Sequence, residues 1–247
     1  MVRWAALAAG LFAAPAEAAC RLALLLALDV SSSVDAREYD LQRAGLAAAL
    51  DAPDIRHAVL TGEGDVALSV YEWSGRFQDK LHLDWTLLRS HADITRAAAV
   101  LAGMERSTSD YPTALGSALG YGALLMTRAP DCARRVIDVS GDGVNNQGFA
   151  PALAYKHFPF QGITVNGLVI LGHDATVLRH YRDEVLRGPG AFLELAQGFE
   201  DFERAMGRKL YREISDIVLG ALPATLLRAC ESFEGSHWAP DRVYCSY

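Results

Sequence analysis

Short apolar runs alternate with helix-like patterns along most of the chain. The clearest run covers Leu22–Leu28 and stops at Asp29, which three serines follow. An apolar run of this length, bounded by turn-forming residues, is typical of a strand buried on both faces of a sheet. We therefore expect the first strand at Leu22–Asp29. Further strands are expected at 64–75, ending near Trp73, and at 80–86, 134–143, 162–171 and 191–195.

Helical patterns fill the stretches between these strands. The first helix is expected at Asp35–Leu50, with Ser33 as its candidate N-cap and Pro53 enforcing its end. Others are expected at 90–104, 113–128, 176–186 and 199–216. This alternation predicts an α/β fold with a doubly wound, mostly parallel, Rossmann-like central sheet flanked by helices. Segment 80–86 alternates apolar and polar residues, which indicates one half-exposed, antiparallel edge strand.

The two ends of the chain differ from the rest. Residues 1–18 have a basic Arg3, a short apolar stretch and a small-residue cleavage pattern, which predict a signal peptide and a mature start at Ala19. A lipid anchor at Cys20 is the less favoured alternative, because Glu17 stands where such sites prefer a small aliphatic residue. The folded domain is expected at 19–216 and a C-terminal extension at 217–247. The product is expected to be periplasmic or secreted.

Export makes the four cysteines candidates for disulfides. Cys20 lies nine residues before Asp29, and Cys132 lies ten before Asp142. Two adjacent parallel strands would place both cysteines level at the opposite edge of the sheet. This predicts Cys20–Cys132 and leaves Cys230–Cys245 to pin the extension; free buried thiols are the alternative.

Composition and charge narrow the function classes. Of the 247 residues, 51% are hydrophobic and 21% are charged, which is ordinary for a globular protein. The formal net charge is −7, and no basic run is present, so nothing favours a nucleic-acid partner. No apolar run reaches the length of a membrane span.

Three separated fragments share a chemical character and a structural setting. "DVSSS" at 29–33, "YPTALG" at 111–116 and "SGDGVNN" at 140–146 each lie where a strand meets a loop or a loop meets a helix. In open parallel sheets such loops converge on one crevice at the carboxyl edge. The candidate ligands are Asp29, Ser31, Ser33, Thr113 and Asp142. Two carboxylates and three hydroxyls suit a hard divalent cation, Mg²⁺ first and Mn²⁺ or Ca²⁺ as alternatives.

This set resembles the metal-ion-dependent adhesion site of the von Willebrand factor type A (VWA) domain family. The match comprises Asp-x-Ser-x-Ser from Asp29 to Ser33, the later Thr113, and the strand-terminal Asp142. The resemblance implies that the hydroxyls bind the metal directly or nearly so, that the aspartates often act through water, and that a partner's carboxylate completes the shell. One departure is Pro112, where a glycine is more typical; it stiffens the loop but leaves the threonine hydroxyl in place.

The sequence outside these motifs resembles an exported bacterial branch of that family, DUF1194-like and of unknown function. The shared phrases are "EWSG" at 72–75, "VIDVSGDGVNN" at 136–146, "GITVNGLVIL" at 162–171 and "GPGAF" at 188–192. The resemblance spans about Leu22–Asp216.

Each single residue also has a plainer interpretation. A serine of "DVSSS" can cap a helix, and Asp142 can simply shape a turn. Glu72 and Asn145 are possible supports behind the ligands, although a loop-stabilising or backbone-shaping role is at least as plausible for each. Asp138, a carboxylate inside an apolar strand, predicts a buried ion pair with Arg134 or Arg135.

The leading hypothesis is an exported VWA-type binding module rather than an enzyme. The bound cation would capture an acidic group of an unidentified protein partner. A metal-assisted hydrolase or phosphatase and a purely structural metal that ties loops together are the alternatives. Signatures such as G-x-S-x-G, H-E-x-x-H or a P-loop are missing from the sequence, and the candidate cluster has no free general base.

Overall fold

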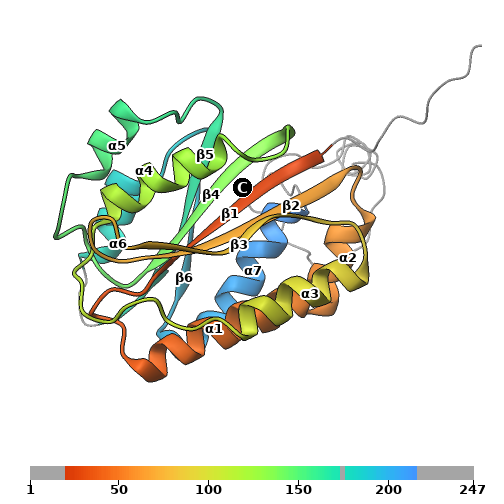
Figure 1. Ribbon diagram of the computed structural model, residues 1–247, viewed down its shortest axis with the longest axis horizontal. Helices are drawn as coiled ribbons and strands as arrows, with labels where there is room; N and C mark the ends of the chain where they lie inside the picture. Colours follow the sequence, from red (N-terminus) through yellow and green to blue (C-terminus); the bar gives the residue numbers. More distant parts are fainter. Residues whose placement is uncertain (1–19, 173–175, 216–247) are drawn as a thin grey trace, which may run out of the picture. The chain divides into compact units, whose positions relative to one another are not determined.

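The computed structural model describes residues 20–172 and 176–215 (Figure 1). The expected signal peptide, the extension at 217–247 and the Cys230–Cys245 pair lie outside the described residues. Six strands form one sheet in the order β3-β2-β1-β4-β5-β6. Their bounds are β1 (Cys20–Asp29), β2 (Asp65–Trp73), β3 (Asp79–Leu88), β4 (Cys132–Gly141), β5 (Ile163–Ile170) and β6 (Leu193–Ala196). Only the β2–β3 pair is antiparallel among these strands, as predicted for the edge.

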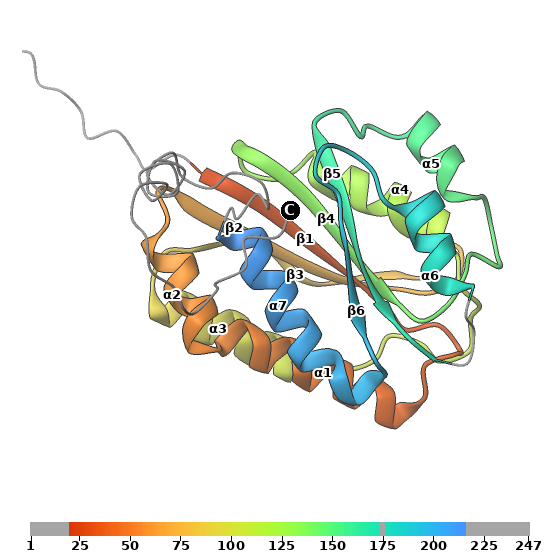
Figure 2. The same ribbon diagram turned by 180° about the vertical axis from the view of Figure 1, so that it is seen from behind.

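Helices cover both faces of the sheet, which confirms the predicted fold class (Figures 1 and 2). One face carries α1 (Ala36–Asp51), α2 (Pro53–Thr61), α3 (His91–Ala102) and α7 (Phe202–Ile214), with the short 3-10 turn η2 (Phe199–Asp201) leading into α7. The other face carries α4 (Leu115–Met126), α5 (Pro151–His157) and α6 (Val177–His180), which continues into the π-helical turn η1 (Tyr181–Val185).

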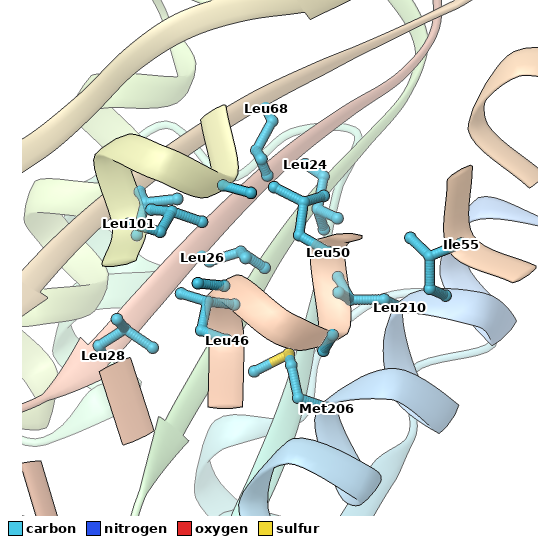
Figure 3. Close-up of a cluster of buried hydrophobic side chains, with 14 of the residues drawn as sticks. Leu24, Leu26, Leu28, Leu46, Leu50, Ile55, Leu68, Leu101, Met206 and Leu210 are labelled. Carbon is cyan, nitrogen blue, oxygen red and sulfur yellow. The ribbon is translucent and has the colours of Figure 1, made fainter. Parts of the chain in front are cut away.

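Strand β1 shows why the sheet is buried on both sides. Its even-numbered leucines, from Leu22 to Leu28, pack under α1, α3 and α7, and Figure 3 shows several of these contacts. Its odd-numbered residues, such as Leu25, face α4. Side chains alternate faces along a strand, so a continuous apolar run fills two cores at once. By the same alternation Asp29 is placed on the α4 face.

The structure corrects the predicted start of the first helix. Asp35 is the N-cap of α1, and its side chain accepts a hydrogen bond from the Glu38 amide at 2.8 Å. The Glu38 carboxylate accepts from the Asp35 amide at 2.8 Å, which completes a capping box. Ser33 is therefore not the cap, and its hydroxyl is available elsewhere.

Two proline-led helices were missed by the sequence patterns. Pro53 ends α1 as expected, but it also stands in the first turn of α2. Pro151 likewise stands in the first turn of α5. Proline fits the first helical position because its missing amide hydrogen has no partner there.

The disulfide between Cys20 and Cys132 is present, with 4.4 Å between the Cα atoms. The two cysteines are directly paired in the parallel register of β1 and β4. This confirms the pairing predicted from the similar distance of each cysteine before the acid at the end of its strand. No helix in residues 20–172 and 176–215 has the length and apolarity needed to cross a membrane.

Asp138 has a different partner from the one predicted. Its Oδ1 lies 3.1 Å from the Lys209 Nζ on α7, and both side chains are buried. Arg134 instead donates to the Glu213 carbonyl, and Arg135 pairs with Asp131. The prediction of Arg134 or Arg135 was wrong because Asp138 points toward the helix packed on that face, and not along its own strand.

Candidate metal-binding site

Two parallel strands bring the candidate carboxylates together. Asp29 is the last residue of β1 and is buried, while Asp142 directly follows β4. Leu28 is paired with Ser140, so Asp29 lies level with Gly141 and one position before Asp142. The strand register therefore places both acids at one point of the carboxyl edge.

A chain of hydrogen bonds joins the three hydroxyls to Asp142. The Thr113 hydroxyl donates to the Ser31 Oγ at 3.1 Å, and the Ser31 and Ser33 Oγ atoms are 3.1 Å apart. The Ser33 hydroxyl donates to the Asp142 Oδ1 at 2.7 Å. The Asp29 Oδ1 accepts from the Ser31 amide at 2.8 Å. The structure thus brings all five predicted ligand residues into one cluster.

Asp29 keeps one carboxylate oxygen without a partner. Its Oδ2 is buried and has no hydrogen bond among the described residues. The nearby Tyr181 hydroxyl is also buried and unpartnered in that part of the chain. A Cβ atom added to Gly141 would lie 2.5 Å from the Tyr181 Oη and 2.8 Å from the Asp29 Oδ2, so only glycine fits between them. Buried polar atoms in folded proteins are normally hydrogen-bonded, and an ion or a water between these two oxygens would satisfy both.

The electrostatics of the cluster favour a cation. Burial, and then the charge of Asp142, raise the pKa of Asp29 to about 7, although hydrogen bonds from Ser31 and the charge of Arg106 oppose the rise. Burial also raises the pKa of Asp142, which the hydrogen bond from Ser33 opposes. Neither acid forms an ion pair with a described lysine or arginine. A buried and a half-buried carboxylate held close together need a positive charge for both to remain ionised.

Hydroxyls have to supply the remaining ligands. In the described residues, no group of three or more His, Cys, Asp and Glu side chains is placed to hold a metal ion. The set here contains two carboxylates, and its other oxygens belong to Ser31, Ser33 and Thr113. An all-oxygen set of this composition fits a hard divalent cation.

Arg106 positions the first loop and was missed by the sequence patterns. Its Nη2 donates to the carbonyl oxygens of Val30, Ser31 and Val34 at 3.0, 3.0 and 2.6 Å. The Ser32 amide donates to the Tyr111 carbonyl at 2.8 Å, which joins the same loop to the one that carries Thr113. A single arginine in a polar loop gives no motif, so sequence reasoning had no signal for it.

The two asparagines hold Thr113 and the start of α4. The Asn146 Oδ1 accepts from the Thr113 amide at 2.8 Å, and the Asn146 amide donates to the Thr113 carbonyl at 2.9 Å. The Asn145 Oδ1 accepts from the Gly116 amide at 3.1 Å, where α4 has no side-chain cap of its own. Both residues link the Asp142 loop to the Thr113 loop; the supporting role expected of Asn145 beside a metal stays a prediction.

Glu72 is buried and braces three elements. It accepts hydrogen bonds from the Tyr39 hydroxyl at 2.7 Å and from the Ser107 amide at 2.9 Å, and it lies 3.1 Å from the His82 Nε2. Burial alone would raise the pKa of Glu72, but the hydrogen bonds from His82, Tyr39 and Ser107 lower it. These contacts fit a bracing role, and its expected support of a metal stays a prediction.

One hollow of the molecule lies away from this cluster. It has a volume of about 830 Å³ and runs between α1 and α7. Charged helix side chains such as Glu203 and Arg208 line it. A smaller pocket of about 380 Å³ adjoins the cluster at Asn145 and His180. We place the candidate site at the sheet edge, because the unpartnered Asp29 Oδ2 lies there together with the hydroxyls of Ser31, Ser33 and Thr113 and the carboxylate of Asp142.

Comparison with known proteins assigns the family. A family profile described as "Protein of unknown function (DUF1194)" matches residues 19–218. The chain belongs to this family. No curated protein sequence matches this DUF1194 chain.

Solved structures of similar fold are VWA-like proteins. Proximal thread matrix protein 1 from the mussel byssus has a TM-score of 0.58 at 16% identity, over 80% of this chain and 47% of that chain. The pilus adhesin SpaC from Lactobacillus rhamnosus GG has a TM-score of 0.57 at 13% identity, over 80% and 30%. A von Willebrand factor type A protein from Catenulispora acidiphila has a TM-score of 0.52 at 15% identity, over 79% and 42%.

These likenesses establish a VWA-like fold for the DUF1194 chain. The chain spans less than half the length of each of the three proteins. One structure of the mussel protein is described as having a zinc-occupied MIDAS motif.

Proposed function

We propose that this chain is an exported module that binds a divalent cation and, through it, an acidic group of a protein partner. The ligands in this proposal are Asp29, Ser31, Ser33, Thr113 and Asp142, with Mg²⁺ as the cation that the set suits best. The observation that carries the proposal is the orphaned, buried Oδ2 of Asp29 beside a continuous chain of hydroxyls. When bound, the cation supplies positive charge and a coordination position open to a carboxylate.

The chain's own residues prepare this site before any partner arrives. Arg106 and the Tyr111 carbonyl fix the Asp29–Ser33 loop, and Asn146 fixes Thr113. The oxygens are therefore held in place by backbone contacts and do not have to be collected on binding. Preorganisation of this kind lowers the entropic cost of binding.

The structural neighbours support a binding role. A pilus adhesin and a byssus matrix protein share the fold, and the latter has been described with zinc at the corresponding type of site. None of the three names quoted above denotes an enzyme. The candidate acids would be committed to the cation, which leaves no free general base in the cluster and supports a non-enzymatic function.

Export is part of the proposal. The Cys20–Cys132 disulfide is of the kind that persists in oxidising compartments, which supports a periplasmic or secreted protein. We propose a signal peptide at 1–18, the VWA-like domain at 19–216 and a separate C-terminal extension at 217–247.

Isothermal calorimetry with Mg²⁺ and Mn²⁺ tests the ligand set. Asp29→Ala and Asp142→Ala should each abolish measurable binding, while circular dichroism shows an intact fold. Asp131→Ala is the matched control, because that side chain is fully exposed at the opposite edge and should leave the affinity unchanged. Wild-type affinity in Asp29→Ala would disprove the assignment. A metal that raises the melting temperature while no acidic peptide binds would establish a purely structural site.

A further inference from the structure

Phe77 stands out at the turn between β2 and β3. Its side chain is 82% exposed, more than any other large hydrophobic residue that the structure describes. Its φ of 62° lies in the left-handed region, and it is the one non-glycine residue with a positive φ in the described ranges. A bulky side chain in this conformation is sterically unfavourable. Neither the exposure nor the backbone conformation of Phe77 therefore benefits folding.

Hydrogen bonds hold the turn in this conformation. The Ser74 amide donates to the Gln78 carbonyl at 3.1 Å, and the Gln78 amide donates to the Gly75 carbonyl at 3.1 Å. The Arg76 amide donates to the Gln147 side chain at 2.9 Å. The Arg76 guanidinium lies 5.4 Å from the centre of the Phe77 ring. The ring is thus presented from a fixed turn. Strained residues that a surrounding structure maintains are frequent at functional sites.

The turn is in contact with the two loops that carry Thr113 and Asp142. A Cβ atom added to Gly75 would lie 2.9 Å from both the Tyr111 Cβ and the Gln147 Oε1. The Ala114 amide donates to the Ser74 carbonyl at 2.8 Å. The β2–β3 turn and the end of β1 lie at the same end of the sheet in both views (Figures 1 and 2). The turn that carries Phe77 is therefore next to the loops of the candidate metal site.

Tyr111 adds a second exposed aromatic ring. It is 41% exposed and precedes Thr113 by two residues, and its carbonyl accepts from the Ser32 amide. Phe77 and Tyr111 thus lie on two segments that contact each other next to the candidate ligands, and Arg76 adds a positive charge beside Phe77. Exposed aromatic residues held in a fixed geometry are typical of binding hot spots.

We propose that Phe77, Tyr111 and Arg76 form a docking surface, aromatic with one positive charge, for the residues beside the partner's metal-bound acid. The inference rests on the proposed function and specifies its partner: a protein segment in which an apolar side chain adjoins an aspartate or glutamate. The β2–β3 turn contacts the loops that carry Thr113 and Asp142, so in this proposal a single segment reaches both the turn and the metal site. Arg76 complements further negative charge on such a segment.

Two synthetic peptides test this surface. Both have a Gly/Ser background and one central glutamate, flanked by leucines in the first and by serines in the second. Fluorescence polarisation in excess Mg²⁺ should show about tenfold tighter binding of the leucine peptide to the wild-type chain, the factor expected for burying part of an aromatic ring. Phe77→Ser should remove this preference and leave the calorimetric Mg²⁺ affinity unchanged. Leu124→Ser, on another exposed residue near the far end of α4, should keep it.

Phe77→Gly protects the test against a folding artefact. Glycine adopts the left-handed region freely, so this variant should melt no lower than the wild type and still lose the preference for the leucine peptide. Equal binding of the two peptides to the wild type, or a preference that survives both Phe77 variants, overturns the inference. So does a monomer–dimer equilibrium that Phe77→Ser abolishes, because it makes a second copy the occupant.

The outcomes for the surface and for the metal site are distinguishable. A preference for the leucine peptide that needs Phe77 but persists in chelator and in Asp142→Ala overturns the metal-dependent function and supports the docking surface alone. Glutamate-dependent binding in Mg²⁺ that is equal for both peptides supports the metal site and overturns the surface.

Discussion

Two pairs of acidic side chains, one fully buried under α7 and one at the carboxyl edge of the sheet, differ in how their charge is balanced. On the α7 face, Asp138 and Glu213 enclose the Lys209 Nζ at 3.1 and 3.0 Å. Asn166 donates a further hydrogen bond to Glu213 at 2.8 Å. At the carboxyl edge, Asp29 and Asp142 are surrounded by hydroxyls, and neither forms an ion pair with a described side chain.

The difference indicates what each cluster is for. Uncompensated buried charge is costly, and on the α7 face the chain supplies its own lysine to offset it. At the carboxyl edge, hydroxyls take the place of the lysine, so Asp29 and Asp142 have no cationic partner in the part of the chain that the structure describes. A cluster that carries its own cation stabilises the fold, whereas a cluster built without one is suited to take a cation from solution. The predictions below test this contrast, beginning with the largest expected effect.

Removing the buried Lys209 charge should cause the largest loss of stability. Lys209→Met leaves Asp138 and Glu213 buried without compensation, and the free energy of unfolding should fall by about 3–5 kcal/mol. Urea denaturation followed by circular dichroism measures it. Lys156→Met, on an exposed lysine, is the control and should change stability by less than about 0.5 kcal/mol. A loss at Lys209 no larger than that of the control would contradict the contrast.

Neutralising an acid at the carboxyl edge should raise the free energy of unfolding in metal-free buffer, whereas removing Lys209 lowers it. Asp29→Asn removes a buried, partly unpartnered charge, so the free energy of unfolding in chelator should rise by about 1–3 kcal/mol. Saturating Mg²⁺ should stabilise the wild type and leave the variant unchanged, because only the wild type binds it. A variant that is less stable than the wild type in chelator would show that the Asp29 charge is already compensated within the chain.

The effect of pH on stability through the α7-face cluster should be smaller than the effects of the two substitutions above. Burial raises the pKa of Asp138 to about 7 although the charge of Lys209 opposes the rise, and the charge of Glu213 adds to it. The folded state then binds more protons than the unfolded state between about pH 4 and pH 7, so this group's contribution to stability falls as the pH rises through that window.

The Asp138→Asn variant isolates that contribution. Subtracting its stability profile in chelator from that of the wild type should leave a slope of about 1 kcal/mol per pH unit or less within the window. Working in chelator keeps metal binding out of the comparison, and the Asp29 contribution cancels because both proteins carry it. Parallel profiles for the two proteins would show that Asp138 keeps the same pKa in the folded and unfolded states.

The same contrast explains what the sequence could and could not predict. Asp29, Ser31 and Ser33 are adjacent in the chain and follow an apolar strand, so their convergence with Asp142 could be inferred from the parallel order. The Cys20–Cys132 pairing followed from the same reasoning. Lys209 lies 71 residues after Asp138, on helix α7, which packs on the face of the sheet that Asp138 points to. No local pattern connects such a pair.

Two further residues show the same limit. Arg106 acts through three backbone carbonyls, which carry no sequence signal. Ser33 was predicted to cap α1 because serine is a good cap, but the Asp35–Glu38 capping box replaced it and left the Ser33 hydroxyl to Asp142. Ser33 and Asp35 are both reasonable caps by sequence, and only the folded arrangement of the loops shows which of them caps α1.

The covalent bond between β1 and β4 has a consequence for how the protein matures. Each strand is ten residues long, and the bond joins their first residues. A one-residue slip between the strands would move the two acids out of alignment, and oxidation of the correct thiol pair forbids that slip. The bond also closes a separation of 112 residues, which reduces the number of unfolded conformations to be searched. Thiol oxidation at one edge of the sheet thereby sets the spacing of the candidate oxygen ligands at the other.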